Sequence, residues 1–238
     1  MCRVLVENQT VTLDGKDVLR DVNLDVEGGI TAIIGPNGAG KTTLLKSIAG
    51  IVAPSKGRVL VCGLEAREAS RMIAYVPAYL MVDPHAKVED VIEAYLHGVR
   101  GVDVESVLKS SGLERFRGRK FNTLSGGEHK LVLIAGAIAR NPKLLLLDEP
   151  FSHLDLANQV KLAKILRGER GEGRTIIMTA HEPLHASIAD RVALMNSGSI
   201  MAYGKPEDVV RRELLEKVYG VELLEITVEG GRALIPRF

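Results

Sequence analysis

Short apolar runs that alternate with helical stretches form the main pattern of the chain. The runs ITAIIG at 30–35 and KLLLLDE at 143–149 are apolar over most of their length, which is typical of strands buried on both faces. Further strands are predicted at 58–62, 72–76, 174–180 and 191–198. Helical spacing is found at 42–51, 156–168 and 183–189. This alternation predicts an α/β fold with a mostly parallel sheet covered on both faces.

The N-terminal segment has a different pattern. Residues 3–6 and 11–13 are predicted to be short strands with a turn at Asp14-Gly15, and residues 18–26 alternate apolar with polar. Alternation is typical of a half-buried strand, so we expect an antiparallel β subdomain here.

The middle third is helical, and the C-terminal segment mixes a helix with strands. Residues 78–139 carry the helical period over 88–99, 104–112 and 129–139, which predicts an inserted helical subdomain. A helix is expected at 206–220, with Pro206 in its first turn and Gly220 at its end. A hairpin over 221–236 is expected around Glu229-Gly230-Gly231.

Composition narrows the class of protein. The 31 basic and 30 acidic residues give a net charge of +1, and 46% of the 238 residues are hydrophobic. These values exclude a disordered chain and give no general attraction to nucleic acid. Cys2 and Cys62 suggest neither a metal cluster nor a disulfide framework, so a reducing, intracellular setting fits best. The apolar stretch 131–139 is too short to span a bilayer, and no signal peptide is recognised.

The segment GPNGAGKTT at 35–43 matches the phosphate-loop pattern G-x-x-x-x-G-K-[ST] between a buried strand and a helix. Its backbone N–H groups and the helix N-terminus suit a polyphosphate. Lys41 would reach the β- and γ-phosphates, and the Thr42 hydroxyl would bind Mg²⁺. The alternative is a glycine-rich turn that binds nothing.

Two acids end the apolar strand LLLLDEP at 144–150. Asp148 would hold Mg²⁺, and Glu149 would polarise the attacking water as a general base. Alone, such a pair is equally well explained as two solvated acids at the start of a loop.

The segment LSGGE at 124–128 offers a second anion site at the N-terminus of a helix. Ser125 is also a plain N-cap, with Glu128 completing a capping box, and both roles can hold together. If the two phosphate-reading segments act on different copies of the chain, ATP would bridge a symmetric dimer.

With FSHLD at 151–155 and MTAH at 178–181, these motifs resemble the ATPase subunit of an ABC transporter in order and spacing. The resemblance implies a P-loop NTPase forming a single domain over 1–238: a nucleotide-binding core of 1–77 and 140–238, a helical subdomain of 78–139 that holds the signature motif, and a C-terminal helix and hairpin over 206–238.

It also implies a head-to-tail dimer with two ATP molecules at the interface. Lys41, Glu149 and His181 would be catalytic, His181 through the γ-phosphate, while Thr42 and Asp148 would hold the metal. The residues expected to contact the nucleotide are Gly35, Pro36, Asn37, Gly38, Ala39, Gly40, Lys41, Thr42, Thr43, Ser125, Gly126, Gly127, Glu128, Asp155, Leu13 and Val18.

Three positions depart from the family pattern. Ala78 stands where a glutamine normally contacts Mg²⁺ and the attacking water, which predicts active but slower hydrolysis. Leu13 stands where a tyrosine commonly stacks on adenine, although Leu13 and Val18 can form an apolar shelf. Glu128 replaces the usual glutamine of the signature motif, and we expect a modest effect.

A second motif conflicts with these. His181 and His185 satisfy H-E-x-x-H, the zinc protease pattern, but Pro183 fits only the first turn of a following helix, so the pair would straddle a turn. The other histidines have no predicted role.

The resemblance predicts an ATPase at the inner, cytoplasmic face of the cell membrane, bound to a transmembrane permease and served by a substrate-binding protein, with no nucleic acid partner. Residues 78–100 would form the groove for the permease, or else Tyr79, Leu80, Met81 and Val82 are internal packing. The C-terminal segment is similar to subunits serving iron–siderophore, haem, cobalamin and molybdate importers, which favours import of a metal chelate. The alternatives are a soluble ABC ATPase on a non-transport complex and an ATP-dependent dimerisation module with weak hydrolysis.

Overall fold

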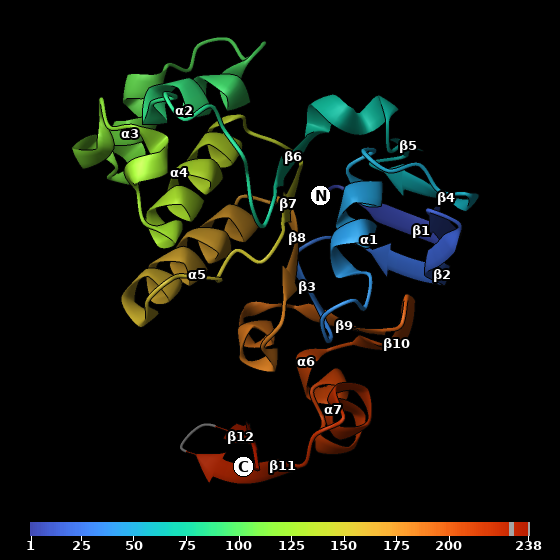
Figure 1. Ribbon diagram of the computed structural model, residues 1–238. Helices are drawn as coiled ribbons and strands as arrows, with labels where there is room; N and C mark the ends of the chain where they lie inside the picture. Colours follow the sequence, from blue (N-terminus) through green and yellow to red (C-terminus); the bar gives the residue numbers. More distant parts are fainter. Residues whose placement is uncertain (229–230, 238) are drawn as a thin grey trace.

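The computed structural model describes residues 1–228 and 231–237, and within them six strands form the central sheet in the order β10-β9-β3-β8-β7-β6 (Figure 1). Neighbouring strands from β9 to β6 run parallel, and β10 is antiparallel to β9. Their bounds are β3 Ile30–Ile34, β6 Ile73–Val76, β7 Leu144–Leu147, β8 Thr175–Ala180, β9 Arg191–Asn196 and β10 Ser199–Gly204. The predicted fold class, with its mostly parallel sheet, is confirmed; β10 was not predicted.

A second, antiparallel sheet has the order β2-β1-β4-β5. Its strands are β1 Val4–Leu13, β2 Lys16–Val26, β4 Lys56–Val61 and β5 Leu64–Glu65. The sequence predicted two short strands at 3–6 and 11–13, whereas the structure has one. Pairing with β2 shifts register between Val6 and Gln9, and Asn8 has a φ of 46° there. A bulge therefore interrupts the alternation that the prediction relied on, without ending the strand.

Helices cover both faces of the central sheet. Helix α1 (Lys41–Ile48) lies between the central and the antiparallel sheet, contacting β8 on one side and β4 on the other, while α4 and α5 pack on the opposite face (Figure 1). The other helices are α2 Val88–Leu96, α3 Val104–Ser111, α4 Gly126–Ala139 and α5 Leu156–Gly171, with 3-10 helices η1 Glu68–Met72, η2 Glu114–Phe116, η3 Phe121–Thr123 and η4 Pro183–Ile188.

Successive residues of the buried strands feed two separate cores. Ile33 and Ile177 face the core around α1, while Ile34 and Ile176 face the larger core shared with the helical segment. This is the period-2 alternation of a strand with both faces buried. Packing on both faces of the sheet therefore holds the ends of its strands in place.

The C-terminal segment differs from its prediction in one respect. The expected helix 206–220 is broken into α6 (Pro206–Val209) and α7 (Arg212–Tyr219), because Val210, with ψ at 66°, leaves the helical region. Strands β11 (Leu223–Val228) and β12 (Gly231–Pro236) pair antiparallel as expected. Of the predicted turn, Glu229 and Gly230 lie outside the described residues.

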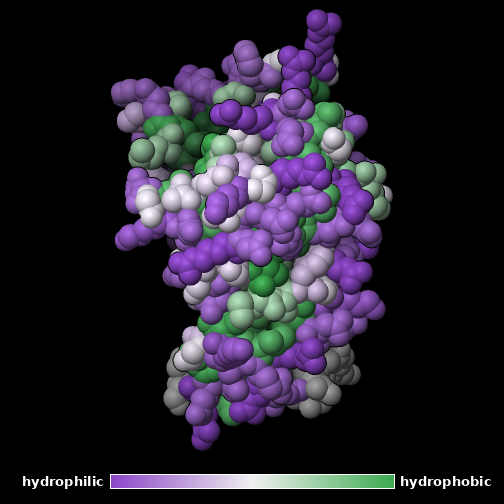
Figure 2. Space-filling model, turned by 90° about the vertical axis from the view of Figure 1, so that its right-hand side faces the viewer, coloured by the Kyte–Doolittle hydropathy of each residue, from purple (hydrophilic) through white to green (hydrophobic). Residues whose placement is uncertain are grey.

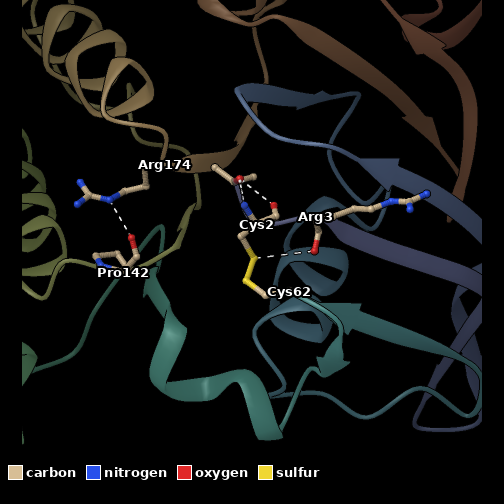
Figure 3. The surroundings of a disulfide bond; sticks show 6 residues. Cys2, Arg3, Cys62, Pro142 and Arg174 are labelled. Atoms are coloured by element: carbon tan, nitrogen blue, oxygen red, sulfur yellow. Dashed lines mark hydrogen bonds between the residues drawn. A yellow bond between two sulfur atoms is a disulfide. The ribbon is translucent and has the colours of Figure 1, made fainter.

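The expectation for the two cysteines was wrong, because Cys2 and Cys62 form a disulfide (Figure 3). They are 60 residues apart in sequence, yet β1 and β4 pair from Val4↔Val61 onward, which leaves the two α-carbons 4.7 Å apart. The Thr175 hydroxyl also binds both the N–H and the carbonyl of Cys2. Strand pairing across a long sequence separation, which spacing alone does not show, creates the bond.

The outer surface is mixed. Figure 2 shows a face dominated by hydrophilic residues, with apolar ones gathered at the upper left and in the lower half. Within the described ranges, none of the helices combines the length and the apolar character needed to cross a membrane.

Candidate functional site

The loop 35–40 joins β3 to α1 and is folded tightly against its neighbours. Gly35 has a φ of 151°, and a Cβ there would come within 2.2 Å of the Met195 carbonyl oxygen. Gly40, with φ of 99°, is the N-cap of α1 and leaves the helix start without a side-chain cap. The first N–H groups of α1 are therefore free to bind an anion.

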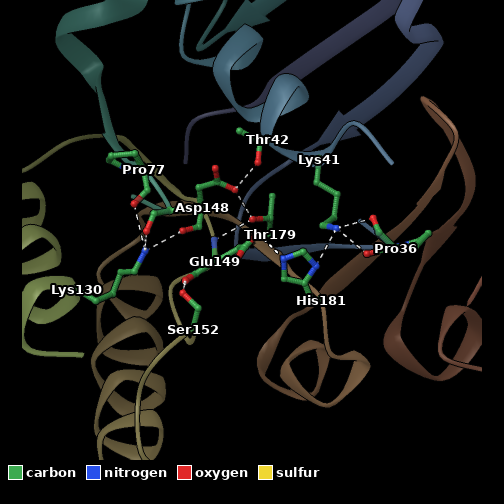
Figure 4. A network of polar contacts seen from close by, with 12 residues as sticks. Pro36, Lys41, Thr42, Pro77, Lys130, Asp148, Glu149, Ser152, Thr179 and His181 are labelled. Carbon is green, nitrogen blue, oxygen red and sulfur yellow. Dashed lines mark hydrogen bonds and ion pairs between the residues drawn. The ribbon is translucent and has the colours of Figure 1, made fainter. Parts of the chain in front are cut away.

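Lys41 holds its ammonium group over this loop. Nζ donates to the carbonyls of Gly35 at 2.6 Å and Pro36 at 2.9 Å, and lies 3.4 Å from His181 Nδ1 (Figure 4). Burial lowers the pKa of Lys41, while the carboxylates of Glu149 and Asp148 oppose that shift. A poorly solvated cation aimed at a loop of N–H donors suits a phosphate group.

Asp148, only 1% exposed, directly follows β7 and lies beside the start of α1. Its Oδ1 accepts hydrogen bonds from the Thr42 hydroxyl at 3.1 Å and the Thr179 hydroxyl at 2.7 Å (Figure 4). Carboxylate and hydroxyl oxygens are the ligands that Mg²⁺ prefers. These two side chains therefore fit a magnesium ion shared with a bound phosphate.

Glu149 is positioned from both ends. Its backbone, at a φ of 49°, donates its N–H to Thr179 Oγ1 at 2.9 Å, and its Oε1 lies 2.5 Å from His181 Nε2. His181 follows β8 directly, so adjacent parallel strands bring the two side chains together. The imidazole thus lies between the Glu149 carboxylate and the Lys41 ammonium (Figure 4).

These groups surround a cavity of about 280 Å³. The cavity is lined by Val18, Asn37, Gly38, Ala39, Gly40, Lys41, Thr42, Thr43, Glu149 and His181. Val18 is where the adenine shelf was predicted, whereas Leu13 is 42% exposed at the end of β1 and lies outside this lining.

The segment LSGGE lies apart from that cavity. Ser125 caps α4 and Glu128 completes the capping box, as predicted. The Ser125 N–H bound to the Glu128 carboxylate lowers the pKa of that acid. None of the described residues 124–128 lines the cavity, and neither does Asp155, which is exposed and caps α5 through the Asn158 N–H.

The two histidines of H-E-x-x-H have different surroundings. His185, in η4, stacks on Phe151 with ring centroids 4.7 Å apart, while His181 faces Glu149 and Lys41. The described residues hold no group of three or more His, Cys, Asp or Glu side chains arranged around a metal position.

Sequence reasoning missed Lys130. Its side chain, 3% exposed, donates from Nζ to the carbonyls of Pro77 at 3.2 Å, Ala78 at 3.0 Å and Asp148 at 3.2 Å (Figure 4). Burial lowers the pKa of Lys130, and Asp148 and Glu149 oppose that shift. A lysine just before an apolar helical run was the available signal. The Lys130 side chain connects α4, the helix that begins at the signature motif, to the residue after β7.

Tyr75 and Thr179 were also missed, because both belong to strands that read as plain core. The Tyr75 hydroxyl lies 3.5 Å from Asp148 Oδ2, and burial together with Asp148 raises the pKa of Tyr75. Tyr75 also lines a second cavity, of about 600 Å³, with Pro77, Leu80, Val82 and Tyr95. Tyr79 and Met81, at 80% and 83% exposed, stand beside it, so this segment is not simply internal packing.

Comparison with known proteins places these motifs in one family. The family model described as "ABC transporter" matches residues 19–152. A hemin import ATP-binding protein of Rhodopseudomonas palustris is 32% identical, covering 99% of this chain and 95% of that protein. A manganese transport system ATP-binding protein of Synechocystis is 36% identical, covering 81% of this chain and 80% of that protein.

Solved structures agree over the whole fold. An inward-facing ABC transporter assigned to the metal-chelate type has a TM-score of 0.86 at 27% identity, covering 100% of this chain and 98% of that chain. A dimeric ATP-binding cassette in a post-hydrolysis state, bound to ADP and Pi, has a TM-score of 0.77 at 27% identity, covering 85% of this chain and 98% of that chain.

Proposed function

Because the chain belongs to the ATP-binding proteins of ABC transporters, we propose that it hydrolyses ATP to drive a membrane permease that imports a metal chelate. The observation that carries the ATPase part is the cavity that gathers Lys41, Glu149 and His181 beside Thr42 and Asp148. The division into a core of 1–77 and 140–238 and a helical subdomain of 78–139 belongs to the same proposal.

Each group in the cavity has a chemical task. The N–H groups of the loop and the Lys41 ammonium bind the β- and γ-phosphates. Thr42 and Asp148 would hold Mg²⁺, which would supply positive charge beside the phosphate oxygens. Glu149 accepts a proton from the attacking water, and the His181 ring keeps the Glu149 carboxylate in place beside the γ-phosphate. Val18 would support the adenine from the cavity lining, whereas Leu13 lies outside that lining.

A second copy of the chain completes the site. Ser125, Gly126, Gly127 and Glu128 lie at the start of α4, where Ser125 and Gly126 are exposed, away from the cavity of their own chain. In a head-to-tail dimer, their N–H groups and hydroxyl face the γ-phosphate held by Lys41 of the other copy, and Asp155 lies at the interface. The ADP- and Pi-bound dimer among the similar structures supports this arrangement.

The cavity of about 600 Å³ is the permease contact in this proposal. It opens between the end of β6 and helix α2, is lined mainly by apolar groups, and has Tyr79 and Met81 exposed at its side. A short permease helix of apolar and aromatic residues fits such a groove. The chain then sits at the inner, cytoplasmic face of the membrane, in a system with a substrate-binding protein and without nucleic acid.

The cargo is proposed from the relatives. The hemin import protein and the transporter of metal-chelate type match this chain over nearly its whole length, including the C-terminal segment. The manganese protein covers less of the chain. We therefore propose an organic metal chelate rather than a bare metal ion.

Purification from native membranes tests the permease role. The tagged chain is extracted with mild detergent, and a many-helix permease is expected to accompany it. Ala94→Arg places a charged side chain in the groove and should abolish this recovery, whereas Glu93→Arg, on the exposed side of the same helix, should keep it. Recovery of a soluble complex, or of the permease with Ala94→Arg, would contradict the proposal.

A substitution at Ala78 tests whether the chain is a transport ATPase or a module that dimerises with ATP and hydrolyses little. We expect Ala78→Gln to raise the rate of ATP hydrolysis, because an amide there can contact Mg²⁺ and the attacking water. Equal rates for the two proteins would show that this position has no part in hydrolysis. No measurable hydrolysis by either protein would favour the dimerisation module.

A further inference from the structure

The C-terminal helix α7 reaches the catalytic site through its last residue, Tyr219. The Tyr219 hydroxyl donates a hydrogen bond to the His181 carbonyl oxygen at 3.1 Å. Burial raises the pKa of Tyr219 to about 12, and the nearby Gly35 backbone opposes that rise. One side chain from the C-terminal segment therefore holds the segment that carries the histidine.

This contact lies where strands β3 and β8 stop pairing, and there a backbone carbonyl needs a new hydrogen-bond donor. Strands β3 and β8 pair in parallel from Ile30↔Ile176 to Ile34↔Ala180, and the next residues on each strand are Gly35 and His181. There the chains diverge, one into the phosphate loop and the other into η4. Backbone groups at a diverging pair lose their ladder partners and need another. The phenol supplies that partner to the His181 carbonyl, while the Gly35 carbonyl accepts its hydrogen bond from Lys41.

Tyr219 is itself held firmly by the C-terminal segment. Leu215 and Val218 of α7 are buried in the larger core, and Tyr219 packs against that core. The Glu216 carboxylate accepts hydrogen bonds from the Leu223 N–H at 2.8 Å and from Arg212 at 2.9 Å, which ties α7 to β11. Displacement of α7 would therefore move the phenol away from both strand ends.

We propose that Tyr219 is a positioning residue for ATP hydrolysis. It holds the His181 carbonyl where β8 ends, so that the imidazole stays between the Glu149 carboxylate and the Lys41 ammonium. The inference rests on the role proposed above for His181. It makes the C-terminal segment, which lies outside residues 19–152, part of the catalytic geometry.

Tyr219→Phe removes only the hydroxyl and tests this directly. We expect kcat for ATP hydrolysis to fall about fivefold to tenfold, the effect of one lost positioning hydrogen bond, with KM for ATP within about twofold. The control is Tyr203→Phe on β10, which removes the hydroxyl of a phenol that is 37% exposed and lies outside the cavity, and it should leave kcat unchanged. An unchanged kcat in Tyr219→Phe overturns the inference.

Two further measurements separate positioning from a general loss of structure. In the nucleotide-free protein, amide hydrogen exchange should speed up in Tyr219→Phe around His181 and Gly35, and the central strands should exchange as before. In a double-mutant cycle, Tyr219→Phe should have no further effect on the residual rate of His181→Ala.

The outcomes are distinct. Full additivity with His181→Ala, or unchanged exchange at both strand ends, overturns the role of Tyr219 and leaves the proposed function standing. Normal hydrolysis by His181→Ala removes the proposed role of His181, and the inference about Tyr219 falls with it.

Discussion

The two segments proposed to bind phosphate, 35–43 and 124–128, are built in opposite ways. Around 35–43, the side chains are assembled before any ligand: Lys41, Asp148, Glu149 and His181 already contact one another or their shared neighbours. At 124–128, the Ser125 and Glu128 side chains each accept a hydrogen bond from the other residue's backbone N–H, away from that cavity. One segment is assembled within the chain, whereas the other is proposed to act on a second copy.

Under the proposed function, this difference would make hydrolysis depend on assembly. If the donors are divided between two surfaces, charge stabilisation at the γ-phosphate is complete only in the dimer. Lys130 joins the two kinds of region, because it lies on the signature helix and hydrogen-bonds the Asp148 carbonyl.

The largest expected effect comes from stopping the chemistry on the pre-organised side. Glu149→Gln removes the general base, so hydrolysis should fall at least about 100-fold, while ATP binding persists. Because ATP is no longer consumed, a dimer should accumulate, and light scattering with Mg-ATP would detect it. Glu172→Gln, an exposed acid at the end of α5, is the control and should behave as the unmodified protein. A monomer with bound ATP would contradict the shared site.

The next effect tests the exposed side. Ser125→Ala should lower ATPase activity at least about tenfold and leave the ATP affinity of the monomer unchanged, since Ser125 is outside its own cavity. Losing the helix cap also costs about 1 kcal/mol of stability.

Asp103→Ala controls for that loss of stability. Asp103 caps α3 through the Ser106 N–H at 2.7 Å, far from the signature motif in sequence, so its loss should destabilise comparably and spare activity. Weaker ATP binding by the Ser125→Ala monomer would mean that the two segments are not separate.

A smaller effect is expected at the residue that joins the regions. Lys130→Met leaves three carbonyl oxygens without their shared donor, which should lower the free energy of unfolding by about 1–3 kcal/mol in a urea titration. Lys130→Gln can still donate hydrogen bonds and should recover part of the loss. Equal stability in all three proteins would show that the ammonium does not hold the strand ends.

The smallest effect is a pH dependence that belongs to His185. Burial lowers the pKa of His185 from 6.5, and nearby Glu182 opposes this. The contribution of the neutral ring is complete above pH 6.5 and is lost as the pH falls toward the lower folded-state pKa, because only the unfolded chain then takes up the proton. Thermal unfolding at a series of pH values should show less acid destabilisation in His185→Phe. An identical acid dependence would exclude His185 as its source.

Local signals explain which features the sequence predicts. Buried strands such as Ile30–Ile34 and Leu144–Leu147 are continuous apolar runs, and the phosphate loop is one segment of nine residues, so both are visible without tertiary structure. The fold class follows from them.

Features that depend on pairing across the sequence were not predictable in the same way. The contact of Lys130 with Pro77 spans 53 residues, and the Cys2–Cys62 disulfide spans 60. The bulge in β1 and the break at Val210 each replace the expected local pattern with one that the packing selects. The positions missed are those whose partners lie on another element.

The disulfide turns the first quarter of the chain into a covalent ring. The ring contains the phosphate loop and α1, and the rest of the polypeptide is attached to it at Cys62. In the chain-entropy model, a ring of this size lowers the conformational entropy of the unfolded chain and thereby raises the free energy of unfolding by about 4 kcal/mol. A single peptide cleavage at the Asp14-Gly15 turn would leave one molecule rather than two fragments, with both strands of the nearby hairpin still tethered to the nucleotide site.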